Sequence, residues 1–93
     1  MSIKIKIYYP HLRVLTDNLD VVEVTGSSIG QCLNELAERF PGIRKKIFND
    51  HGKLLHFINI IHNNNSTHLD PDPLLIQVRD GDVIGITLLI AGG

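Results

Sequence analysis

SIGQCLNELAERF, residues 28–40, is the stretch that decides the fold, because its apolar residues recur at the spacing of one helix face. That face consists of Ile29, Cys32, Leu33, Leu36 and Phe40. Ser28 directly precedes Ile29, and Gln31 lies three residues after Ser28, a spacing that fits a capping box. Pro41 and Gly42 then end the helix. We therefore predict one main amphipathic helix that buries this face.

Alternating apolar and polar residues predict two strands before the helix. The first covers Ile3–Tyr9 and ends at Pro10, and the second covers Asp20–Val24. Residues 16–18 are expected in the hairpin loop between them. The residues expected to face the core occupy alternate strand positions: Ile3, Ile5, Ile7, Val22 and Val24.

The rest of the chain contains shorter elements. We predict a helical turn within residues 43–50, a strand at Phe57–Ile61, a polar turn at residues 63–66, an irregular segment at Leu69–Pro73, a short apolar element at Leu74–Val78, a turn at Asp80–Asp82 and a last strand at Val83–Ile90. The order is β-β-α-β-(β)-β. This is an α+β fold, in which one main helix packs on one face of a mixed sheet of four to five strands.

Length and charge exclude several classes of function. A chain of 93 residues makes one domain with a small core. Nine basic and ten acidic residues give a net charge of −1, so nothing supports nucleic-acid binding. The sequence has no apolar run of transmembrane length, and its lone cysteine rules out an internal disulfide. We expect a cytoplasmic protein with no membrane or nucleic-acid partner.

Residues that suggest chemistry have simpler explanations here. His51, His56, His62 and His68 share no recognised ligand spacing, so we expect surface histidines and no metal. Cys32 lies on the helix stripe and is expected to be a buried, inert thiol. Asp80 and Asp82 flank a glycine and are expected to form a turn. No catalytic residue is predicted, so we do not expect an enzyme.

The final residues, Ala91-Gly92-Gly93, suggest a different kind of site. Glycine lacks a Cβ, so two in succession make a thin and flexible thread. Such a thread fits a narrow enzyme channel and presents the Gly93 carboxylate to ATP. We therefore expect a folded domain at residues 1–90 and a flexible tail at residues 91–93.

These motifs together resemble the ubiquitin-like β-grasp sulfur carriers, the type of the molybdopterin synthase small subunit and the thiamine sulfur carrier. The resemblance lies in Asp80-Gly81-Asp82, the strand Val83-Ile84-Gly85-Ile86 and the ending Ala91-Gly92-Gly93. Within the family, Gly52-Lys53-Leu54 and His56-Phe57-Ile58-Asn59-Ile60 resemble the carriers of cysteine biosynthesis. Two departures stand out. Leu88-Leu89-Ile90 replaces a usual proline, and His62 replaces a usual aliphatic residue.

The resemblance implies chemistry at Gly93. An adenylating enzyme similar to ubiquitin-activating enzyme would use ATP to activate its carboxylate, and sulfur would convert it to a thiocarboxylate. Ala91 and Gly92 would enter the partner's active site. The implied acceptor is a cysteine synthase that depends on pyridoxal phosphate, and this chain itself would bind no cofactor.

Three alternatives stay open from the sequence. The chain could be the small subunit of molybdopterin synthase, a modifier that forms isopeptides through Gly93, or a binding module whose glycines are incidental.

A partner surface is also predicted on the sheet. If Ile58, Ile60, Ile84 and Ile86 face inward, apolar neighbours on the same strands face outward and can form a docking patch. The predicted surface consists of Phe57, Ile61, Val83 and Thr87.

Overall fold

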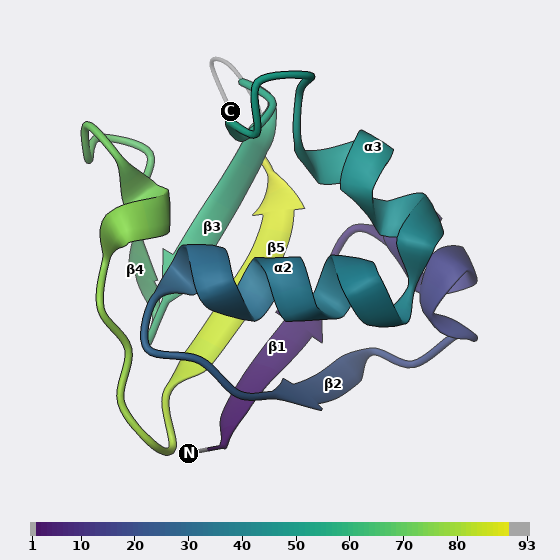
Figure 1. Ribbon diagram of the computed structural model, residues 1–93, viewed down its shortest axis with the longest axis horizontal. Coiled ribbons are helices and arrows are strands. Elements are labelled where there is room, and N and C mark those ends of the chain that lie inside the picture. Colours follow the sequence, from purple (N-terminus) through teal and green to yellow (C-terminus); the bar gives the residue numbers. More distant parts are fainter. Residues whose placement is uncertain (1, 90–93) are drawn as a thin grey trace.

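A five-stranded mixed sheet forms one layer of the protein, and helix α2 lies across one face of it (Figure 1). The computed structural model describes residues 2–89, so the predicted tail at residues 91–93 lies outside the described residues. The strands run in the order β2-β1-β5-β3-β4. Their bounds are β1 Ile3–Ile7, β2 Val21–Val24, β3 Ile58–His62, β4 Asn65–Ser66 and β5 Val83–Leu88.

The centre of the sheet joins two strands that are far apart in the sequence. Strand β1 pairs with β5 in parallel, whereas the β1–β2, β3–β5 and β3–β4 pairs are antiparallel. The predicted inward residues of β1 and β2 are all buried, with exposures of 0–3%. The mixed α+β fold with five strands is therefore confirmed.

Helix α2, Ile29–Arg39, covers the inner face of the sheet. Its buried residues are Ile29, Cys32, Leu33, Leu36 and Ala37. The Ser28 hydroxyl accepts a hydrogen bond from the Gln31 backbone N–H (3.2 Å), as a capping box requires. The Gln31 side-chain oxygen differs from that expectation, because it accepts hydrogen bonds from the backbone and hydroxyl of Ser27 instead (both 2.8 Å).

The connection between β1 and β2 contains helical turns that the sequence did not predict. Helix α1 covers Pro10–Arg13 and the 3-10 helix η1 covers Val14–Thr16, where a plain hairpin loop was expected. Pro10 is the reason, because its fixed φ ends a strand and equally suits the first position of a helix. The first strand accordingly ends at Ile7, before the predicted Tyr9.

The remaining short elements differ in detail from the predicted ones. The 3-10 helix η2 (Pro41–Ile43) and helix α3 (Arg44–Ile47) supply the predicted helical turn. The polar turn is tighter than predicted, because only Asn63 and Asn64 form it, with φ of 49° and 71°, and residues 65–66 are strand β4. The apolar element after residue 72 is the 3-10 helix η3, Pro73–Leu75.

Candidate functional site

The face of the sheet opposite α2 carries a patch of apolar groups from β3, β5 and the segment just after β1. Strand pairing places Ile61 opposite Gly85 on one side and Lys6 opposite it on the other. A Cβ added at Gly85 would lie only 3.0 Å from the ring of Tyr8 and 3.4 Å from the Cβ of Ile61. Glycine at this position therefore lets the Tyr8 ring lie directly on β5 beside Ile61.

Three of the four predicted surface residues lie on the two strands, β3 and β5, that supply Ile61 and Gly85 to this contact. On β3 and β5, Ile61, Val83 and Thr87 are partly exposed and alternate with buried isoleucines, while Phe57, just before β3, is 39% exposed. Sequence reasoning missed Tyr8, which is 55% exposed, and Gly85. We call the set Tyr8, Phe57, Ile61, Val83, Gly85 and Thr87 the outer-face patch.

The end of β5 shows what replaces the usual proline. Leu88 pairs with Ile58, and the N–H of Leu89 donates a hydrogen bond to the Phe57 carbonyl (2.8 Å). Proline has no N–H, so it could not make this bond. Sheet pairing therefore extends as far as Leu89, the last described residue.

Replacing Leu89 with proline should weaken this end of the sheet. We expect Leu89→Pro to lower the free energy of unfolding by about 1 kcal/mol more than Leu89→Ala does, because only proline removes the N–H donor. Urea denaturation of the two variants and the parent measures the difference. Equal losses in both variants would show that the hydrogen bond contributes nothing.

A groove of about 420 Å³ lies beside Leu89. Its other lining residues come from the loop before β3, the first residue of β3 and the segment around η3: Lys53, Leu54, Leu55, His56, Ile58, His68, Asp70, Pro71, Asp72, Pro73 and Leu74. The chain passes this groove at the end of the described residues. The predicted modification site Gly93, with Ala91 and Gly92, lies outside them.

The second departure, His62, was expected at the surface, and that expectation is wrong because its side chain is half-buried in a polar cluster between the β3–β4 hairpin and the turn before β5. The Asp82 carboxylate is 2.8 Å from Nε2 of His62 and accepts hydrogen bonds from the Asn63 side chain (3.0 Å) and the Arg79 N–H (2.9 Å). These hydrogen bonds, with Asn63 contributing most, lower the pKa of Asp82 from 3.8 to about 2. The predicted turn at Asp80–Asp82 therefore also connects the β3–β4 hairpin to the segment before β5 through hydrogen bonds of Asp82.

The lowered pKa of Asp82 predicts a pH dependence of stability. Because the folded state favours the ionised carboxylate, its stabilisation is fully present above pH 3.8 and is lost as the pH falls toward 2. We expect the unfolding free energy of the parent to fall more steeply over this range than that of Asp82→Asn. Urea denaturation between pH 2 and pH 5 tests this, with the exposed Asp50→Asn as the matched control. Parallel profiles for the parent and Asp82→Asn would contradict it.

The other residues singled out from the sequence do not form a site. Cys32 is fully buried, as predicted, and burial raises the pKa of its thiol to about 11, so the thiol is protonated at neutral pH. Within residues 2–89, no cluster of three or more His, Cys, Asp or Glu side chains could hold a metal ion. In the same range, no helix has the length and apolar character to cross a membrane.

Comparisons with known proteins agree with this architecture. No protein-family model and no curated protein matches the sequence. Among solved structures, a chain of the BexX/CysO complex from Amycolatopsis orientalis is 26% identical, with a TM-score of 0.82 over 98% of this chain and 99% of that chain. The small archaeal modifier protein 1 (SAMP1) from Methanosarcina acetivorans is also 26% identical, with a TM-score of 0.81 over 99% and 96%. CysO from Mycobacterium tuberculosis is 23% identical, with a TM-score of 0.83 over 95% and 99%, and supports the fold alone.

The fold is thus the ubiquitin-like β-grasp, with an open outer sheet face. The structural neighbours are small carrier and modifier proteins of this fold, and they match the β-grasp sulfur-carrier family that the sequence motifs predict.

Proposed function

We propose that this chain is a cytoplasmic sulfur carrier that serves cysteine biosynthesis. The main support is the likeness to the CysO complex chain at 26% identity over nearly the full length of both proteins. The strand motif His56–Ile60, which resembles the cysteine-biosynthesis carriers, supports the same choice.

The proposed chemistry takes place at the Gly93 carboxylate. A carboxylate oxygen attacks the α-phosphorus of ATP and expels pyrophosphate, which gives an acyl adenylate. A hydrosulfide ion then attacks the acyl carbon, and AMP leaves with the bonding electrons. The product is a thiocarboxylate, whose ionised sulfur is a good nucleophile near neutral pH.

The folded body supplies recognition in this proposal. The four residue steps from Leu89 to Gly93 span at most about 14 Å. A partner that receives Gly93 in its active site therefore lies close to the end of β5. The outer-face patch, which includes residues of β5, is available for contact with such a partner.

A protein modifier is the second candidate function. It is favoured by the 26% identity to the small archaeal modifier protein 1. In this role the activated Gly93 would form an isopeptide bond with a lysine of another protein, and no sulfur would be delivered to a small molecule.

Intact-mass spectrometry tests the proposal directly. The chain is incubated with an adenylating enzyme of the ubiquitin-activating type, ATP and sulfide, and the replacement of one oxygen by sulfur is expected. A cysteine synthase that depends on pyridoxal phosphate, with an activated serine, should then yield a covalent cysteine adduct.

Parallel reactions distinguish the alternatives. Formation of molybdopterin with the large subunit of molybdopterin synthase, without a cysteine adduct, would overturn the pathway. Lysine conjugates in cells without thiocarboxylate would favour the modifier. No mass change in any reaction would leave only an inert binding module.

A further inference from the structure

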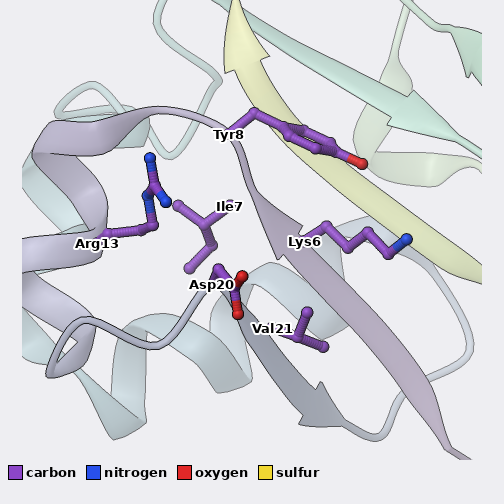
Figure 2. Close-up of a pocket in the computed structure, with 6 residues that line it drawn as sticks. All are labelled: Lys6, Ile7, Tyr8, Arg13, Asp20 and Val21. Carbon is purple, nitrogen blue, oxygen red and sulfur yellow. The ribbon is translucent and has the colours of Figure 1, made fainter.

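A polar pocket of about 330 Å³ lies between β1, α1 and the start of β2 (Figure 2). Its lining residues are Lys6, Ile7, Tyr8, Arg13, Asp20 and Val21. This volume is at the small end of ligand sites, which suits one charged group better than a nucleotide.

The charges in this pocket are not matched by one another. Lys6 and Arg13 contribute two cations and Asp20 one carboxylate, so the pocket carries a net charge of +1 in a chain whose total is −1. Figure 2 shows the Arg13 guanidinium directed away from the Asp20 carboxylate. The ion pairs found among residues 2–89 involve other side chains: Arg39–Glu35, Lys53–Asp72 and His62–Asp82.

The side chain of Arg13 has a buried hydrogen-bond donor without an acceptor among residues 2–89. Its Nε is buried and has no hydrogen-bond partner within the described part of the chain. Buried N–H groups almost always have an acceptor, so this donor suits an acceptor that comes from outside the chain.

The backbone of Arg13 is held in place at the end of α1. Its carbonyl accepts hydrogen bonds from the N–H of Asn18 (2.7 Å) and the hydroxyl of Thr16 (3.1 Å). The backbone at Arg13 is therefore fixed before any ligand arrives, so only the side chain has to be ordered on binding.

We propose that this pocket binds the carboxylate of a Glu or Asp side chain on a partner protein. Nε and a terminal nitrogen of a guanidinium match the two oxygens of a carboxylate. Figure 2 shows the Lys6 ammonium directed away from Arg13, so Lys6 adds only to the positive potential around the pocket. The net charge of +1 suits a singly charged carboxylate, because Asp20 repels a doubly charged phosphate more strongly.

The position of Tyr8 indicates why the carboxylate comes from a protein. Tyr8 lines this pocket and also lies on Gly85 in the outer-face patch. A partner that covers the patch can therefore extend an acidic side chain into the pocket. This step rests on the proposed function, in which a partner docks on that face.

NMR of the Arg13 Nε–H group tests the pocket itself. The probes are acetate, inorganic phosphate and chloride at one ionic strength, and the capped peptides Gly-Gly-Glu-Gly-Gly and Gly-Gly-Gln-Gly-Gly. We expect acetate and the glutamate peptide to shift this signal saturably and the glutamine peptide to leave it unchanged. An equal response to every anion would indicate an adventitious ion only and would overturn the proposal, as would the absence of any saturable shift.

Substitutions of the pocket residues, compared with a control substitution outside the pocket, test whether the peptide binds in this pocket. Arg13→Met keeps the aliphatic stem and should weaken binding of the glutamate peptide about tenfold, as followed through backbone signals around the pocket. Lys6→Met should weaken binding less, because the Lys6 ammonium is directed away from Arg13. Arg44→Met, at an arginine that bonds Asn34 instead, should leave binding unchanged. Asp20→Asn should raise phosphate affinity more than acetate affinity, and an equal change for both would contradict the assigned role of Asp20.

The mass assay separates this inference from the proposed function. Peptide binding without thiocarboxylate formation would remove the proposed function and leave the carboxylate pocket. Sulfur loading and transfer at the parental rate in Arg13→Met would show that the partner does not use the pocket.

Discussion

Deletion of Gly93 is expected to abolish thiocarboxylate formation and leave the unfolding midpoint unchanged. The deletion draws the reacting carboxylate back by one residue, about 3.5 Å along an extended chain. Misplacement of reacting atoms by only about 1 Å can reduce rates 100-fold, so a shift of this size should remove activity. Addition of one alanine after Gly93 should have the same effect.

Two further variants sharpen this prediction. Gly92→Val keeps the chain length and adds a β-branched side chain, which should block a narrow channel and stiffen the thread. Leu69→Ala, at a residue that is 86% exposed in the loop before η3, is the surface control. Intact mass measures loading and thermal unfolding measures stability. Sulfur loading at the parental level in the chain without Gly93 would refute the central role of this residue.

Ile61→Asp is expected to reduce sulfur transfer to the acceptor enzyme about 10- to 30-fold. Ile61 is at the centre of the outer-face patch. A Cβ added at Gly85 would lie 3.4 Å from the Cβ of Ile61 and 3.0 Å from the Tyr8 ring. Apolar residues at the centre of an interface account for most of its affinity, and an unpaired carboxylate there loses its hydration. In the free protein the side chain is partly exposed, so the variant should fold with a loss of about 1 kcal/mol.

Matched substitutions separate docking from stability. Leu69→Asp places the same charge at a remote exposed residue and should transfer sulfur at the parental rate. Ile61→Val keeps an apolar group in the patch and should retain most of the transfer. Single-turnover transfer from preloaded protein measures the effect without the loading step. An Ile61→Asp rate equal to that of Leu69→Asp would exclude the patch as the docking surface.

The elements with strong local periodicity were predicted well. The predicted apolar face of α2 is buried at Ile29, Leu33 and Leu36, all at 0% exposure, whereas Phe40 follows the end of the helix and is only partly buried. The alternation in β1 correctly placed Ile3 and Ile5 in the core. Such patterns repeat within a few residues and follow from backbone geometry alone. Where a residue suits two local structures, as Pro10 suits a strand end and a helix start, the sequence prediction failed.

The site depends on contacts that no local pattern encodes. Tyr8 meets Gly85 and Ile61 only because β1 and β5 pair in parallel at the centre of the sheet. His62 and Asp82 are 20 residues apart and meet across the β3–β5 pair.

The sequence by itself determined the α+β class, the amphipathic faces of α2 and β1, and the Gly92–Gly93 motif on which the proposed chemistry depends. The tertiary structure decided the strand order, the outer-face patch and the pocket around Arg13. The physical reason is the distance along the sequence between the residues that interact. Helical and strand periodicities arise between residues a few positions apart, whereas strand order is fixed by the burial of side chains from distant segments in one shared core.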